Sequence, residues 1–349
     1  MTDTSLDPTP AGSRTSAPTL HDVAAAAGVS LATASRVLNG SARKVAESYR
    51  ERVQAAADEL GYTANLSAQA TARGTSAIIA LLVADIADPY FGQLAAGVAR
   101  GADEAGLVVT IAITERDSAR EMRLVRALRG QRPRGLILAA SRDTESAQPD
   151  LQHEIDALTR TGGRVVALGP GAGDVRTVRI DNEGGARALG AALAQRGYRN
   201  AVIVAAQAGV RTSDDRIAGF TAGFGSGGGS VDRIYRGAFT RDAGEGAMRA
   251  ALADGIPSGT LVFAISDVVA IGALTAIREA GREVGADIAL AGFDDIPTAR
   301  DVTPALTTVR VPLEDIGYQT LRAAVDDAWQ HDPDGIRLEV LLRASTPER

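Results

Sequence analysis

Hydrophobic residues follow two different patterns along the chain. Between Thr19 and Gly61 they recur every three or four positions, which is the spacing of one buried helix face. Beyond Thr75, short and nearly continuous apolar runs alternate with helix-like stretches. The first pattern predicts a small all-helical segment, and the second predicts a larger region of alternating strands and helices.

Three helices are predicted in the first segment, over residues 20–27, 31–38 and 47–60. Thr19 and Ser30 are suitable N-caps for the first two, and Gly28 ends the first helix. A tight glycine turn joins these two helices, as in a helix-turn-helix. The first two helices are expected to share an apolar seam formed by Val23, Ala27, Val29, Ala34, Val37 and Leu38. The apolar positions of the third helix lie on one face and are Tyr49, Val53, Ala56, Ala57 and Leu60.

The second helix keeps a face outside this core, where its N-terminal half would meet base edges in a DNA major groove. Arg36 lies on that face, and arginine donates to guanine in the commonest specific base contact. An ordinary three-helix bundle with a solvated polar face is the alternative. Local charge does not decide between them, because residues 19–74 hold six basic and five acidic side chains.

The sequence TLHDVAAAAGVSLATASRVLNG, followed by RVQAAADELGY, resembles the headpiece of the LacI–GalR family of bacterial transcription regulators. The resemblance implies a homodimer that binds a pseudo-palindromic operator in double-stranded DNA, with Leu31 and Ala32 selecting the operator. The DNA-contacting positions that we expect are Thr19, Ser30, Leu31, Ala32, Thr33, Ser35, Arg36 and Asn39.

Family members follow the headpiece with a short hinge helix that inserts a leucine into the minor groove. The stretch Asn65 to Arg73 matches this hinge, with Thr71 at the leucine position and Ala64 in place of the usual proline, and the hinge segment is expected at residues 63–75. A smaller, polar wedge predicts a weaker bend in the DNA. A plain linker is the alternative. The expected hinge residues are Asn65, Ala68, Thr71 and Ala72.

Parallel sheets covered by helices on both faces are predicted after Thr75, because the strand-like runs are apolar throughout. These runs span residues 77–84, 107–113, 135–139, 164–168, 201–206, 260–265 and 288–293. The region is long enough for two lobes, and a ligand would sit outside the carboxyl ends of the strands. The loops selected by this rule begin at Asp85, Ser141, Ser266 and Phe293.

Three segments of this region resemble the family's effector domain, which is itself similar to periplasmic sugar-binding proteins. They are LLVADIADPYFGQLAAGVARGADEAG, SDDRIAGF and ADIALAGFDDIPTARDVTPALTTVR. The resemblance puts Arg216 in the cleft and Asp294 at the pocket aspartate, whereas Ser266 replaces the usual asparagine before Asp267. The expected effector-binding residues are Asp88, Tyr90, Phe91, Arg216, Ser266, Asp267, Phe293 and Asp294.

These side chains suit a polyhydroxylated effector, since carboxylates accept from hydroxyls and arginine donates to them, while aromatic rings pack on apolar sugar faces. Each also has a structural alternative. Arg216 could be a solvated helix residue, Asp88 could be the N-cap of a helix that begins at Pro89, and either Tyr90 or Phe91 could belong to the core. Of Asp294 and its neighbour Asp295, only one can face the effector.

The sequence therefore predicts a leader at residues 1–18, a headpiece at 19–62, a hinge at 63–75 and a two-lobed effector and dimerisation domain at 76–349. Within the last domain, the N-lobe is expected at 76–180 and 308–335, and the C-lobe at 181–307 and 336–345.

The amino-acid composition excludes several other classes of protein. The chain of 349 residues is 45% hydrophobic and 23% charged, with a net charge of −6, no cysteine and three histidines. This excludes disulfides and thiolate metal sites, and we expect no metal, cofactor or catalytic residue. No membrane span or signal peptide is visible, which predicts a cytoplasmic protein. Gly223, Gly225 and Gly228 spell G-x-G-x-x-G, but a helix-like stretch precedes them and a surface loop is expected.

We therefore expect a DNA-binding transcription regulator, a repressor whose operator affinity is controlled by a small polar effector bound between the lobes. An effector-dependent activator or a corepressor-controlled regulator would use the same architecture. A solute-binding protein would lack the headpiece, and an α/β enzyme would need a catalytic group in the cleft.

Overall fold

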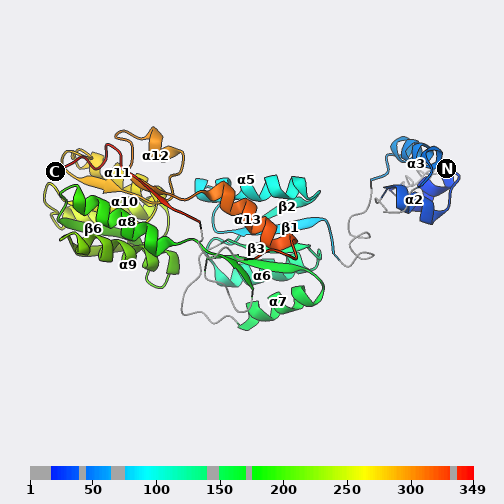
Figure 1. The fold of residues 1–349 in the computed structure, drawn as a ribbon, viewed down its shortest axis with the longest axis horizontal. Coiled ribbons are helices and arrows are strands. Elements are labelled where there is room, and N and C mark those ends of the chain that lie inside the picture. Colours follow the sequence, from blue (N-terminus) through cyan, green and yellow to red (C-terminus); the bar gives the residue numbers. More distant parts are fainter. Residues whose placement is uncertain (1–16, 39–44, 64–74, 140–148, 170–174, 331–335) are drawn as a thin grey trace, which may run out of the picture. The chain divides into compact units, whose positions relative to one another are not determined.

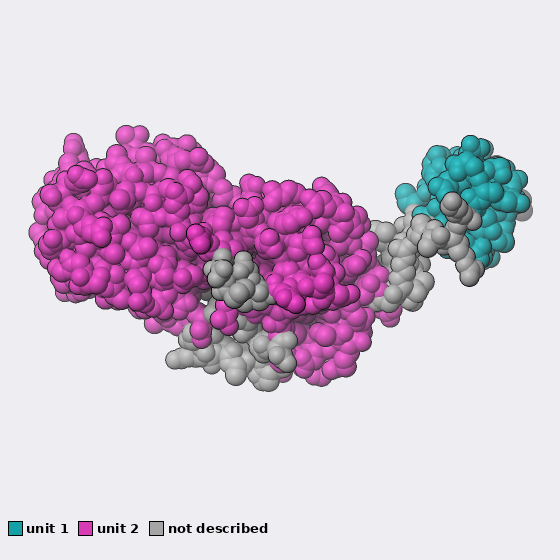
Figure 2. Space-filling model, viewed as in Figure 1, with its two compact units in different colours: residues 1–73 teal, residues 74–349 magenta. Residues whose placement is uncertain are grey.

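The computed structural model describes residues 17–38, 45–63, 75–139, 149–169, 175–330 and 336–349. The chain divides into two compact units, residues 1–73 and residues 74–349 (Figure 2).

The first unit is a three-helix domain, as the apolar spacing predicts. Its helices are α1 (Leu20–Ala26), α2 (Leu31–Leu38) and α3 (Glu47–Leu60). Val23 and Ala34 have no exposed surface and lie at the centre of its core. Tyr49 and Leu60, at the two ends of the predicted apolar face of α3, are 44% and 38% exposed and lie outside this core. The buried stripe of α3 is narrower than predicted, and the Tyr49 ring is covered by the Arg52 guanidinium, whose Cζ lies 5.0 Å from the ring centroid.

Five parallel strands form the first sheet of the second unit, in the order β2-β1-β3-β4-β5. They are β1 (Ile78–Val83), β2 (Val108–Ile113), β3 (Gly135–Leu138), β4 (Arg164–Leu168) and β5 (Arg176–Val178). Successive residues of β1 enter opposite cores: Ile79 and Leu81 pack on one face, and Ala80 and Leu82 on the other.

Helices cover both faces of this sheet (Figure 1). On one face α5 packs against α13, and on the other α6 packs against α7. These helices span Pro89–Glu104 (α5), Leu313–Val325 (α13), Ser118–Arg129 (α6) and Pro149–Arg160 (α7). The five strands and these four helices make up the first lobe.

The second lobe is built on four parallel strands in the order β7-β6-β8-β9. Helix α8 packs against α9, and α10 packs against α11. The strands are β6 (Asn200–Ala206), β7 (Ser230–Gly237), β8 (Leu261–Ala264) and β9 (Ala289–Ala291). The helices are α8 (Asn182–Gln195), α9 (Arg211–Ser226), α10 (Arg241–Ala253), α11 (Asp267–Glu279) and the short α12 (Thr298–Asp301).

Two short strands near the C-terminus change the expected lobe boundary. Strand β10 (Thr308–Arg310) pairs antiparallel with β11 (Glu339–Leu341). Backbone bridges also join residue 307 to 291 and residue 310 to 294, so β10 extends the second lobe beyond β9. Residues 308–310 therefore belong to the second lobe, and the chain enters the first lobe only after them.

Two glycines of the G-x-G-x-x-G sequence lie inside helix α9, so the expected surface loop is wrong. A Cβ at Gly223 would lie 2.0 Å from the carbonyl oxygen of Arg187 on α8, whereas a Cβ at Gly225 would meet nothing within 4 Å. Gly223 therefore permits close packing of α8 on α9 and has no phosphate-binding role. In the described part of the chain, no helix has the length and apolar character needed to cross a membrane.

Candidate functional site

The candidate DNA-binding surface in the first unit is the outer face of α2. Leu31 is 39% exposed, Ala32 and Arg36 are exposed as well, and Thr33 and Ser35 are half-buried. These five predicted contacts are therefore all at least partly accessible to solvent. Asn39 and the hinge residues Asn65, Ala68, Thr71 and Ala72 lie outside the described residues.

The other two predicted DNA contacts are helix caps. The backbone N–H of Thr33 donates to Ser30 Oγ over 3.2 Å. Thr19 donates to Asp22 Oδ2 from its backbone nitrogen over 2.8 Å and from Oγ1 over 2.7 Å. These hydrogen bonds stabilise the starts of α2 and α1, and those donated by Thr19 lower the pKa of Asp22. Any contact of Thr19 or Ser30 with DNA adds to this capping role.

The second unit contains a cavity whose walls come from both lobes. Its empty volume is about 530 Å³, including the part open to solvent, which is in the range of small-molecule sites. The cavity lies at the carboxyl ends of the strands, as parallel sheets favour. Its lining residues are Asp88, Tyr90, Phe91, Arg116, Ala139, Leu168, Gly169, Ile180, Asn182, Thr212, Arg216, Phe239 and Asp294.

Arg216 of α9 is the most constrained polar residue of the cavity, with 1% of its surface exposed. Its Nε donates to Asn182 Oδ1 over 2.9 Å, Nη1 to the Ile265 carbonyl over 2.7 Å, and Nη2 to Asp294 Oδ1 over 2.7 Å. The guanidinium carbon also lies 3.9 Å from the centroid of the Phe293 ring. A guanidinium has five N–H donors, so two remain for a bound molecule.

Asp294 and Asp295 are adjacent in sequence but have different partners. Burial raises the pKa of Asp294 to about 7, and the ion pair with Arg216 opposes this shift. Asp295 accepts instead from Arg310 Nε over 3.0 Å and from Arg343 Nη2 over 2.5 Å. Only Asp294 lines the cavity, in keeping with the expectation that the two carboxylates cannot both face a ligand.

Asp88 is the N-cap of α5 and also lines the cavity. Its Oδ1 accepts from the Tyr90 backbone nitrogen over 3.0 Å, and burial raises the pKa of its carboxyl group. Tyr90 and Phe91 both line the cavity, with their rings edge to face at 5.0 Å, but Phe91 is buried and packs in the core as well. Desolvation raises the pKa of the Tyr90 hydroxyl, which therefore remains a neutral hydrogen-bond donor.

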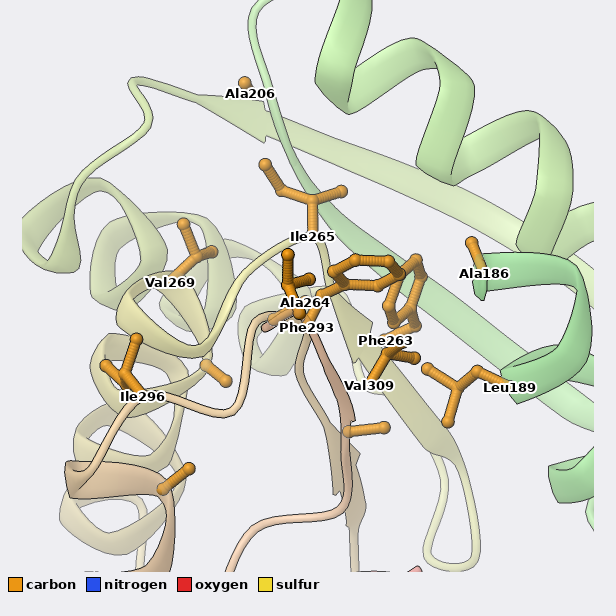
Figure 3. Packing of buried hydrophobic residues seen from close by; sticks show 14 of the residues in the cluster. Ala186, Leu189, Ala206, Phe263, Ala264, Ile265, Val269, Phe293, Ile296 and Val309 are labelled. Carbon is orange, nitrogen blue, oxygen red and sulfur yellow. The ribbon is translucent and has the colours of Figure 1, made fainter. Parts of the chain in front are cut away.

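Three predicted effector contacts do not line this cavity. Ser266 caps α11 by accepting from the Val269 nitrogen over 3.3 Å. Asp267 accepts from the Ile296 nitrogen over 3.0 Å and from Thr308 Oγ1 over 2.7 Å, so its carboxylate is used inside the second lobe. Phe293 has no exposed surface and lies among buried side chains (Figure 3). Phe293 reaches the cavity only indirectly, by packing on Arg216.

Sequence reasoning missed Arg116, Asn182, Thr212 and Phe239, which all line the cavity. Arg116 follows β2 and Phe239 follows β7. Extending the rule of carboxyl strand ends to every strand-like segment, including these two, would have found both residues. In the described part of the chain, no group of three or more histidine, aspartate or glutamate side chains could hold a metal ion.

The two units define a class of protein: a helix-turn-helix domain joined to a two-lobed ligand-binding domain. Residues 19–65 match the lacI family of bacterial regulatory proteins, and residues 191–346 match the periplasmic binding protein-like domain. The regulator CelR of Thermobifida fusca is 33% identical over 328 residues, covering 92% of this chain and 95% of CelR. The repressor CytR of Escherichia coli K12 is 31% identical, covering 95% of this chain and 96% of CytR. The chain belongs to the lacI family and is a DNA-binding transcription regulator.

Solved structures of this family share the fold. A lac repressor dimer bound to operator and the anti-inducer ONPF superposes with a TM-score of 0.79 at 27% identity, covering 95% of this chain and all of that one. A CelR–cellobiose complex gives a TM-score of 0.67 at 30% identity, covering 94% and 99%. The predicted fold class is therefore confirmed.

Proposed function

We propose that this regulator is a repressor whose affinity for its operator is controlled by a small polyhydroxylated effector, a sugar or a related metabolite, bound in the cavity of the second unit. The observation that carries the proposal is the buried Arg216, held by Asn182 and Asp294 in the wall of a cavity that both lobes line. Its two remaining donors and the carboxylates of Asp88 and Asp294 match the donors and acceptors of sugar hydroxyls.

The relatives support a sugar as effector, since one solved neighbour is a complex of CelR with cellobiose and another contains bound ribose. We assign direct effector contacts to Asp88, Tyr90, Arg216 and Asp294. We assign an indirect role, the stabilisation of the second lobe around these contacts, to Ser266, Asp267 and Phe293. Because the relatives are transcription regulators, we infer that the chain is not an enzyme and acts in the cytoplasm on DNA.

The operator-binding form in this proposal is a homodimer on a pseudo-palindromic site, as in the lac repressor dimer bound to operator. Residues 19–62 form the headpiece, 63–75 the hinge and 76–349 the effector and dimerisation domain. The face of α2 reads the bases through Leu31, Ala32 and Arg36, and a two-fold dimer spaces two such faces by a whole number of DNA turns. In this proposal the hinge contacts the DNA through Asn65, Ala68, Thr71 and Ala72.

The first experiment selects binding sites for the full chain from a random DNA pool at about 0.1 M salt, because affinity for DNA depends on salt. Enrichment of a two-fold-symmetric site is expected, and no enrichment with or without sugars would contradict the proposal. Titrating sugars against the selected site then gives the sign of control. Release of DNA supports an effector that relieves repression, whereas tighter binding supports control by a corepressor.

A further inference from the structure

Arg116 lines the cavity without forming an ion pair with any described residue. It lines the cavity together with Arg216, but it forms no ion pair or hydrogen bond with any described residue. The guanidinium stacks on Phe239 of the other lobe, whose ring centroid lies 4.6 Å from the guanidinium carbon. One face of the guanidinium is therefore covered by an aromatic ring, and no described residue accepts a hydrogen bond from its in-plane N–H groups.

The loop that carries Arg116 is held in an unfavourable backbone conformation. Glu115 and Arg116 have φ angles of 55° and 58°, a left-handed region that non-glycine residues rarely occupy. Hydrogen bonds fix the loop: the Glu115 nitrogen donates to the Ala84 carbonyl over 3.0 Å, and Arg120 Nε donates to the Ile113 carbonyl over 2.8 Å. Two consecutive strained residues held by such bonds favour a functional reason for the position of Arg116.

The charges near Arg116 limit what can bind beside it. Asp88 lines the same cavity, but its carboxylate and the Arg116 guanidinium do not form an ion pair. Burial lowers the pKa of Arg116 and raises that of Asp88, and each of these groups favours the charged form of the other. Asp85 contributes a further negative charge near Arg116, and the charge of Asp88 raises the pKa of Asp294.

A ligand group that contacts both Arg116 and Asp88 in the cavity must accept a hydrogen bond from the first and donate one to the second. A hydroxyl does both, because it carries one donor and two acceptor sites. A phosphate dianion or a carboxylate only accepts, and it would add negative charge beside Asp88 and Asp294. The geometry therefore favours a neutral ligand at this position.

We propose that Arg116 is a further effector-binding residue that sets specificity: with Asp88 it binds one hydroxyl of a neutral sugar, and this pair discriminates against sugars that carry phosphate or carboxylate there. The inference rests on the proposed effector function of the cavity.

The test is calorimetric titration of the full chain with two matched pairs of probes, ribose with ribose 5-phosphate and cellobiose with cellobionate. Wild type is expected to bind at least one neutral sugar about tenfold or more tightly than its anionic counterpart. Arg116→Gln should lower the affinity for that sugar by about ten- to a hundredfold, because a hydrogen bond from a charged donor is lost. Asp88→Asn should narrow the preference for the neutral member. Arg123→Gln, an exposed arginine on the following helix, is the matched control.

Arg116→Asn provides a second variant, because asparagine tolerates the left-handed backbone, and unfolding midpoints verify that each variant is folded. Unchanged sugar affinity in both Arg116 variants, a wild type that prefers the anionic probe, or a wild type that binds none of the four probes overturns the assignment. Failure of the proposed function is distinguishable from these results, since operator binding would then respond to no sugar at all. If operator binding by Arg116→Gln still responds to the sugar with unchanged affinity, only the assignment of Arg116 fails and the proposed function stands.

Discussion

Replacing Arg216 by methionine is expected to destabilise the second unit by about 3–5 kcal/mol, the usual cost of removing one partner from a buried ion pair. Methionine fills much of the space of the side chain but donates none of its three hydrogen bonds. The carboxylate of Asp294, only 4% exposed, loses its counter-charge, and the carbonyl of Ile265 loses its donor.

The size of this loss should depend on pH. Asp294 already has a pKa of about 7 beside Arg216, and removing the guanidinium raises that pKa further. Protonation at pH 6 therefore removes the uncompensated charge, whereas at pH 8 the folded variant must either bury that charge or take up a proton against the solution pH. The difference in stability between wild type and variant is expected to be larger at pH 8 than at pH 6.

Differential scanning calorimetry of the full chain measures the effect as a lower unfolding temperature, by about 6–20 °C for a unit of this size. Arg249→Met is the matched control. Arg249 also contacts two carboxylates, Glu245 and Glu279, but its side chain is 56% exposed, and exposed pairs contribute at most about 1 kcal/mol. A decrease for Arg216→Met no larger than for this control, or one that is the same at both pH values, would refute the reasoning.

Four further predictions concern other parts of the chain. Arg36→Ala should weaken operator binding and relax sequence preference by about 1–3 kcal/mol at one base pair, and a selected-site profile identical to that of wild type would exclude base reading by Arg36. Thr71→Leu should tighten operator binding and increase the DNA bend in a circular-permutation gel, whereas an unchanged bend would contradict a wedge at this position. Gly223→Ala should lower the free energy of unfolding by about 1–3 kcal/mol, because its Cβ would meet the α8 backbone. Gly225→Ala on the same helix should leave the stability unchanged or raise it. Equal melting temperatures of the two variants would refute the packing argument. The pKa of Asp294 rises from 3.8 to about 7 on folding, so the folded chain binds this proton more tightly than the unfolded chain. Lowering the pH from 8 to 6 should therefore raise the melting temperature of wild type relative to that of Asp294→Asn. The same change of melting temperature with pH in both proteins would contradict this prediction.

Sequence motifs located some of the residues that line the cavity but not others, such as Asn182, which accepts a hydrogen bond from Arg216. Asp88, Arg216 and Asp294 were predicted from local segments, and all three line one cavity although α9 and the β9 segment lie far apart in sequence. Ser266 and Asp267 lie in an equally recognisable segment, yet their side chains are used by the α11 cap and by Thr308. A sequence motif predicts the position of a backbone segment in the fold. The partners of its side chains depend on residues that are distant in sequence.

The fold shows the same limit at its short elements. The boundaries of α3 follow from its helical spacing and from Gly61, which adopts a left-handed φ of 61° at the C-cap. Strands β10 and β11 have three residues each and no alternating pattern of sufficient length, so they exist because they pair with each other and extend the second lobe. The lobe boundary at residue 308 was misplaced for this reason.

Control of DNA binding in this architecture requires an effector that contacts both lobes. The contacts proposed in the second lobe, Arg216 and Asp294, are fixed by buried hydrogen bonds, while those proposed in the first lobe, Asp88 and Arg116, belong to loops. A molecule that touched only one lobe would bind equally well whatever the angle between the lobes, and it could not shift the equilibrium between their arrangements. A molecule that contacts both favours the arrangement in which both sets are within reach, and its coupling to DNA binding cannot exceed that difference in affinity. Weakening the first-lobe contacts should therefore reduce the response of operator binding even when saturating sugar compensates for the lost affinity.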